Sequence, residues 1–154
     1  INNAVASLGT AFSQNHMNLM FKLRRKITFC FDSDEAGLKA AWRALQISLK
    51  NVVDDKTVRF LFLPEGYDPD SFVKENGEKE FYKKLDRAMV LESFAFQYLK
   101  RGKKLDSPED IRQIIIEFKK ILPLVTSEML KETLMTKFSS ELNINKEIFL
   151  RRKN

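Results

Sequence analysis

The pattern of hydrophobic and polar positions divides the chain into two regions. Up to about residue 87, short apolar runs alternate with amphipathic stretches, and from residue 88 onward apolar residues recur at helical spacing. Strands that alternate with helices are typical of an α/β fold with a parallel sheet. We therefore predict an α/β region over 1–87, a parallel sheet flanked by helices, followed by a small all-α helical subdomain over 88–154.

Three short strands and two connecting helices are predicted in the first region. The strands span residues 4–8, 27–31 and 57–63, and the helices span 13–22 and 35–49. The second helix carries apolar residues at i, i+3, i+4, i+7 and i+11, the stripe of a helix that packs on a sheet. Gly37 in its first turn lacks a side chain, which leaves room for a ligand or for neighbouring backbone.

The second region contains three predicted helices and a last short segment, at 89–100, 108–122, 127–142 and 146–152. Ser107 and Pro108 form a helix start, and Pro123 ends the helix that they begin. This region has no catalytic signature of its own, so we interpret it as a structural or docking unit.

Composition narrows the functional classes. The 154 residues are 44% hydrophobic and 31% charged, as expected of a globular protein. The one cysteine, Cys30, excludes a disulfide framework and a cysteine-based zinc site, so we expect a cytoplasmic protein. No run approaches the ~20 apolar residues of a membrane span. The net charge of +6 is weak evidence for a polyanionic partner, and His16, on an exposed helix, is not expected to be catalytic.

The candidate chemistry lies at the end of the strand 27–31, where Asp32 and Asp34 follow an unbroken apolar run. Side chains at i and i+2 of an extended chain leave the same face, so these two carboxylates can converge on one ligand. Mg²⁺ takes one or two carboxylates and leaves its other positions to water or phosphate, as in phosphoryl-transfer sites. The alternative interpretation is that Asp34 caps the following helix, with Glu35 placed favourably against the helix dipole.

A second acidic pair with the same spacing, Asp68 and Asp70, follows the strand 57–63. The alternative here is helix initiation, with Asp68 as the cap, Pro69 at the first helical position and Asp70 in the first turn. Ligands of parallel sheets bind outside the carboxyl ends of the strands. Because both acidic pairs follow such ends, we expect the four carboxylates to face one cleft.

Three motifs, at residues 3–12, 29–41 and 63–70, resemble in sequence and spacing the Toprim portion of bacterial replicative primases, the DnaG family. The helical region from residue 88 resembles the bundle that closes the primase polymerase core. The resemblance implies a partial Toprim fold, with residues 1–87 as the C-terminal part of the metal-binding Toprim domain and residues 88–154 as the helical bundle subdomain.

The resemblance also implies a DNA primase, a nucleotidyltransferase that makes short RNA primers from nucleoside triphosphates on a single-stranded DNA template by two-metal transfer. Asp32 and Asp34 correspond to the family's catalytic D-x-D metal ligands. Asp68 and Asp70 correspond to its later Asp-Pro-Asp, beside the metals. The implied cofactor is Mg²⁺ or Mn²⁺. The family's third main ligand, a glutamate in an E-G-Y-x-D-like segment, would precede Ile1.

Further family features would lie outside these residues, namely zinc in an amino-terminal domain and contact with the replicative helicase through a carboxyl-terminal domain. Because the upstream glutamate ligand would precede Ile1, we expect this chain by itself to bind metal only weakly. Without that ligand and the other family features, we expect it to be inactive. Three alternatives stay open at this point: another Toprim protein, topoisomerase or nuclease-like; a haloacid-dehalogenase-type phosphatase with Asp32 as nucleophile; and a non-catalytic helical interaction module with 88–150 as its docking surface.

Overall fold

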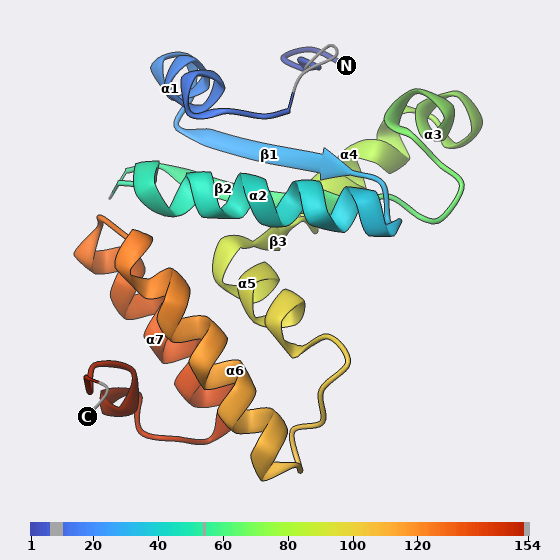
Figure 1. Ribbon diagram of the computed structural model, residues 1–154. Coiled ribbons are helices and arrows are strands. Elements are labelled where there is room, and N and C mark those ends of the chain that lie inside the picture. The colour runs from blue at the N-terminus through green and yellow to red at the C-terminus, as the bar shows by residue number, and fades with distance from the viewer. Residues whose placement is uncertain (7–10, 54, 153–154) are drawn as a thin grey trace.

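The computed structural model describes residues 1–6, 11–53 and 55–152. A small three-stranded sheet lies above a layer of helices (Figure 1). The elements of the first region are α1 (Gln14–Leu23), β1 (Lys26–Phe31), α2 (Glu35–Asn51), β2 (Thr57–Phe62), α3 (Pro69–Asn76), α4 (Glu78–Asp86) and β3 (Met89–Val90). Those of the second are α5 (Leu91–Lys100), α6 (Pro108–Ile121), the 3₁₀ helix η1 (Leu122–Leu124), α7 (Glu128–Leu142) and the 3₁₀ helix η2 (Lys146–Phe149).

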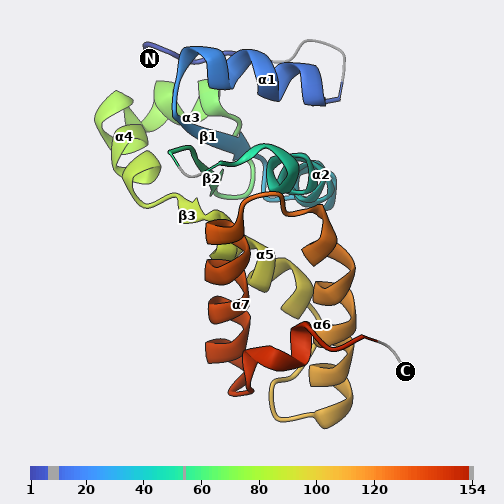
Figure 2. The same cartoon turned by 90° about the vertical axis from the view of Figure 1, so that its left-hand side faces the viewer.

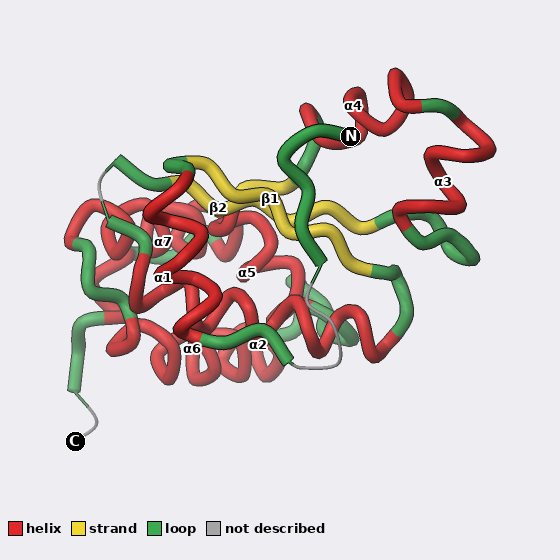
Figure 3. Tube along the Cα trace, turned by 90° about the horizontal axis from the view of Figure 1, so that it is seen from above, coloured by secondary structure: helices red, strands yellow, loops and turns green. Residues whose placement is uncertain are grey.

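The sheet has the order β1-β2-β3, which confirms the α/β prediction but makes the sheet mixed. β1 and β2 pair in parallel, with Lys26 opposite Thr57 and Phe31 opposite Phe62, and α2 connects them. β3 pairs antiparallel with β2. Seen from above, α3 and α4 project to one side of the strands instead of running back along them (Figure 3). The chain therefore re-enters the sheet from its carboxyl edge, in the opposite direction to β2.

The structure differs from the sequence-based prediction in three elements. Of the predicted strand 4–8, residues 4–6 form no strand, and residues 7 and 8 lie outside the described residues. The predicted helix 89–100 begins only at Leu91, because Met89 and Val90 pair with β2. Helix α4 was not predicted; it is short, buries only Phe81 and has only the partly buried Leu85 one turn later on the same face.

The other helices form where capping residues and apolar spacing predict them. Ser13 caps α1, Ser107 caps α6 and Ser127 caps α7, each accepting a hydrogen bond from a backbone N–H in the first turn. Helix α7 ends at Asn143, which adopts the left-handed conformation with φ of 52°. Helices α6 and α7 lie side by side below the sheet (Figure 2).

The hydrophobic core crosses the junction between the two regions. One cluster of buried side chains runs from Met17 and Leu45 through Phe60 to Phe94, Phe118 and Phe149. A smaller cluster covers the carboxyl end of β2, with Leu61 and Leu63 against Phe72 of α3 and Phe81 of α4. The helical region thus packs directly on the sheet region. The division into domains at residue 87 stays a prediction. Among the described residues, no helix has the length and apolar character needed to cross a membrane.

Candidate metal centre

The acidic loop after β1 is formed by Asp32, Ser33 and Asp34, and α2 begins directly after it. Asp34 is the N-cap of α2, and its Oδ1 accepts a hydrogen bond from the backbone N–H of Gly37 at 2.6 Å. The capping role predicted for Asp34 is therefore confirmed. A carboxylate has two oxygens and about four lone-pair directions, so this hydrogen bond leaves it capacity to bind a cation as well.

Ser33 fixes the acidic loop to the neighbouring strand end. Its hydroxyl donates a hydrogen bond to the carbonyl oxygen of Leu63, 30 residues away. The N–H of Leu63 in turn donates to the carbonyl oxygen of Phe31 at 3.2 Å. These two bonds join the carboxyl ends of β1 and β2, so the loop that carries Asp32 and Asp34 is held beside the end of β2.

Gly37 allows α2 to approach the same loop from the other side. A Cβ at this position would lie 2.8 Å from the carbonyl carbon of Asp32 and closer still to its oxygen. The space predicted at Gly37 is therefore taken up by backbone, not left for a ligand. As a result, the first turn of α2 packs directly against Asp32.

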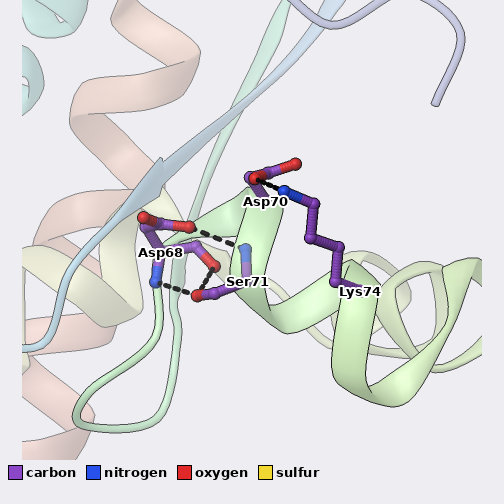
Figure 4. A network of polar contacts seen from close by, with 4 residues as sticks. All are labelled: Asp68, Asp70, Ser71 and Lys74. Atoms are coloured by element: carbon purple, nitrogen blue, oxygen red, sulfur yellow. Dashed lines mark hydrogen bonds and ion pairs between the residues drawn. The ribbon is translucent and has the colours of Figure 1, made fainter.

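The second acidic pair initiates α3 (Figure 4). The Asp68 carboxylate accepts a hydrogen bond from the N–H of Ser71 at 2.8 Å, and the Ser71 hydroxyl accepts one from the N–H of Asp68 at 3.0 Å. Asp70 forms an ion pair with Lys74 at 2.6 Å. The hydrogen bonds from Ser71 lower the pKa of Asp68, and the bond to Asp70 raises the pKa of Lys74. The predicted helix-initiating roles of Asp68, Pro69 and Asp70 are confirmed.

The four aspartates do not form a compact cluster. Within the described parts of the chain, no group of three or more His, Cys, Asp or Glu side chains is placed to hold a metal ion. The two acidic pairs do follow strands that are neighbours in the sheet, as expected. The assignment of Asp32, Asp34, Asp68 and Asp70 as metal ligands therefore stays a prediction.

The donor set of the acidic loop nevertheless fits a hard cation. Asp32 and Asp34 are exposed at the carboxyl edge of the sheet and provide only oxygen donors. Mg²⁺ is usually bound in this way, by one or two carboxylates with water and phosphate in the remaining positions. Cys30 is not a competing soft ligand, because burial and the nearby Asp32 raise the pKa of its thiol to about 11.

Two contacts near the site join residues that sequence reasoning did not connect. The Arg101 Nη2 lies 2.8 Å from the Glu35 Oε2, so the end of α5 is linked to the first residue of α2. The rings of Trp42 and Tyr98 stack with centroids 4.2 Å apart and an interplanar angle of 7°. Each contact joins residues more than 50 positions apart, so no local sequence signal marks it.

His16 helps to cap α1. Its Nδ1 accepts a hydrogen bond from the backbone N–H of Ser13 at 3.1 Å and completes a capping box at the start of α1. Its ring packs on Phe12, with the ring centroids 5.7 Å apart.

Comparison with known proteins gives a consistent result. Residues 1–73 match the Toprim-like family model. The chain is 54% identical to a DNA primase of Pseudomonas aeruginosa over 100 residues, which cover 64% of this chain and 15% of the relative. It is 35% identical to a DNA primase of Escherichia coli K12 over 144 residues, which cover 94% of this chain and 25% of the relative.

A solved structure, the DnaG primase catalytic domain bound to ssDNA, matches with a TM-score of 0.83 and 34% identity. The match covers 90% of this chain and 45% of that one. The chain thus spans a quarter or less of the curated relatives and about half of the solved catalytic domain. Its sequence and its fold agree in placing it in one family: the chain belongs to the DnaG family of bacterial DNA primases and has the fold of their Toprim-containing catalytic core.

Proposed function

We propose that this chain supplies the metal-binding part of a primase catalytic core, which makes short RNA primers from nucleoside triphosphates on a single-stranded DNA template. The observation that carries the proposal is the acidic loop of Asp32 and Asp34, fixed by Ser33 on one side and by the close approach of Gly37 on the other. The relative bound to ssDNA supports the choice of template.

Asp32 and Asp34 are the primary ligands in this proposal, for Mg²⁺ or Mn²⁺. Such an ion lowers the pKa of a primer 3′-hydroxyl and neutralises charge on the incoming triphosphate. The hydrogen bond from Gly37 orients the Asp34 carboxylate, and the Ser33 bond holds the loop at the sheet edge. Preorganised ligands of this kind lose little freedom when they bind.

Asp68 and Asp70 have a secondary place in the proposal. Asp68 caps α3, and Asp70 is paired with Lys74, so direct binding of a cation by Asp70 requires that ion pair to open. The remaining family features, an upstream glutamate ligand, a zinc-binding domain and contact with a replicative helicase, belong in this proposal to the full-length protein. Its setting is the cytoplasm, where bacterial DNA is replicated.

Primer synthesis by the full-length protein tests the proposal. Asp32→Asn and Asp34→Asn remove a negative ligand but keep the side-chain size, and Asn caps a helix about as well as Asp. We expect primer synthesis to fall by at least about a hundredfold in each variant, because removing one transition-state stabilising group costs on the order of 10²–10³ in rate. Asp106→Asn, at an exposed aspartate in the turn before α6, is the matched control and should leave synthesis unchanged.

Retained synthesis in both Asn variants would remove the metal assignment. A stable acyl-phosphate on Asp32, detected by mass spectrometry after incubation with a phosphate ester, would instead support the phosphatase alternative. Loss of synthesis together with a large drop in melting temperature would show that the aspartates act through folding.

A further inference from the structure

A cavity of about 390 Å³ opens at the edge of the sheet, between β2, α4 and β3. Figure 2 shows α4 leading into β3 at this edge. The walls combine apolar side chains of the strands, among them Phe62 and Met89, with charged side chains of α4 and the turn after it. We call this the α4–β3 cavity. None of the four candidate metal ligands lines it.

The cavity exists because β3 is shorter than the strand it pairs with. β3 pairs only with Arg59 and Phe60, so β2 continues to Phe62 without a neighbour on that side. The N–H groups of Thr57 and Leu63 both point toward β1, where they bond to carbonyl oxygens. Since backbone groups alternate sides along a strand, those of Phe62 point away from β1, toward the cavity.

The rim of the cavity carries an excess of positive charge. Lys83, Lys84 and Arg87 face a single carboxylate, Glu80. Glu80 already forms an ion pair with Lys83, with 2.6 Å between Lys83 Nζ and Glu80 Oε1, and the hydrogen bond from Lys83 lowers the pKa of Glu80. Neither Lys84 nor Arg87 forms an ion pair with any residue in the described parts of the chain. Two cations are therefore available to an anion from outside.

The residues of β2 and β3 that line the cavity are apolar, and we call this part of its wall the floor. Phe62 and Met89 are both partly exposed, although they lie beside the main core. A flat aromatic ring can lie on such a floor, since aromatic side chains stack on nucleic-acid bases at about 1–3 kcal/mol per base. The volume lies within the range of about 300–1,000 Å³ that is usual for small-ligand sites. An apolar floor beside two available cations fits a ligand that has both a planar ring and a phosphate.

We propose that the α4–β3 cavity binds a nucleoside phosphate, with the phosphate on Lys84 and Arg87 and the base on Phe62 and Met89. The ligand is either a free nucleotide or one unit of a single-stranded nucleic acid. This second site does not depend on the metal centre, so it binds its ligand in the absence of divalent ions. Its test is therefore separate from the test of primer synthesis.

The experiment compares two double variants of the full-length protein that lose the same charge. The cavity variant, Lys84→Gln with Arg87→Gln, removes the two available cations from the cavity rim. The control variant, Arg43→Gln with Arg112→Gln, removes two exposed cations from α2 and α6. Binding of a fluorescein-labelled dT₁₂ oligonucleotide and of ATP is measured in EDTA at several salt concentrations. All four side chains are exposed or on the cavity rim, and melting temperatures verify that each variant is folded.

If the ligand is a unit of a single strand, the cavity variant should lose about tenfold in affinity for dT₁₂. Its log–log salt slope should fall by about 0.7, because Lys84 and Arg87 together hold one phosphate and each neutralised phosphate of a single strand contributes about 0.7. If the ligand is a free nucleotide, ATP binding should weaken instead. In both cases the control variant should bind as the unchanged protein does.

Equal weakening by both double variants would show only general attraction to a basic protein and would overturn the proposal. Unchanged binding in the cavity variant would also overturn it. If the cavity variant does not fold, crosslinking of the unchanged protein tests the site instead. Ultraviolet irradiation of the unchanged protein with an iododeoxyuridine-containing oligonucleotide or with 8-azido-ATP should label Phe62 or Met89, and labelling confined to other segments would contradict the site.

Discussion

Gly37 lies so close to the backbone carbonyl group of Asp32 that no larger residue fits between them. A Cβ at position 37 would lie 2.8 Å from the Asp32 carbonyl carbon, and backbone atoms cannot yield as a flexible side chain can. The same Gly37 donates its N–H to the Asp34 carboxylate. One glycine therefore sets the position of both aspartates of the candidate metal centre relative to α2.

Replacing Gly37 by alanine should destabilise the protein and displace the acidic loop. Alanine normally stabilises a helix interior by ~1 kcal/mol relative to glycine. Overpacking against fixed atoms costs about 1–3 kcal/mol, so we expect a net loss of stability in urea unfolding. Ala40→Gly, at an exposed position of the same helix, calibrates the propensity term. An increase in stability for Gly37→Ala would contradict the close contact.

Asp34 should show separable contributions to folding and to catalysis. Asp34→Ala removes the cap of α2 and should cost ~1 kcal/mol, whereas Asp34→Asn should keep most of that stability. Both variants should lose primer synthesis in the full-length protein, because both lose the negative ligand. Thermal melts and a synthesis assay on the two variants provide the comparison. If Asp34→Asn retains both the stability and the primer synthesis of the unchanged protein, capping is the only role of Asp34.

Ser33→Ala should loosen the acidic loop without changing its charge. The variant loses the hydrogen bond to the Leu63 carbonyl, and a typical hydrogen bond contributes about 0.5–1.5 kcal/mol to stability. We also expect a higher Mg²⁺ concentration for half-maximal primer synthesis, since the two aspartates are then less well positioned. Ser33→Thr keeps the hydroxyl and is the control. An unchanged Mg²⁺ requirement would show that this hydrogen bond does not position the ligands.

The Glu35–Arg101 ion pair should contribute little, and its contribution should depend on salt. The two side chains are 59% and 43% exposed, and exposed pairs give about 0.2–1 kcal/mol in double-mutant cycles. A cycle with Glu35→Gln and Arg101→Gln should give a coupling in this range at low salt that falls at 1 M NaCl. A coupling that persists at high salt would indicate that the pair acts through packing.

Trp42 should report on the packing of α2 against α5. It is the only tryptophan of the chain, and it stacks on Tyr98. Because one core cluster includes both regions, unfolding followed by Trp42 fluorescence and by far-ultraviolet circular dichroism should coincide. Tyr98→Leu should lower stability by about 0.5–1.5 kcal/mol beyond the loss in Tyr98→Phe, which keeps the ring. Two separate transitions would show that the sheet and the helical region unfold independently.

The sequence alone determined the features that depend on neighbouring residues. Asp34 and Asp68 could be recognised as helix caps because a cap bonds to N–H groups two or three residues away. Strands β1 and β2 were evident from their apolar runs, and their parallel pairing followed from the helix between them. The position of the acidic loop at the carboxyl edge of the sheet follows from these local facts.

Tertiary structure decided the features that depend on distant residues. The antiparallel pairing of β3 places two residues of a predicted helix in a strand, because the edge of β2 offers backbone partners there. The hydrogen bond from Ser33 to Leu63 and the ion pair of Glu35 with Arg101 join segments 30 and 66 residues apart. The basic rim of the α4–β3 cavity likewise arises only when α4, which buries a single side chain, docks beside β2. Contacts of this kind have no periodic signal, since they are fixed by how the elements pack and not by the order of residues within one element.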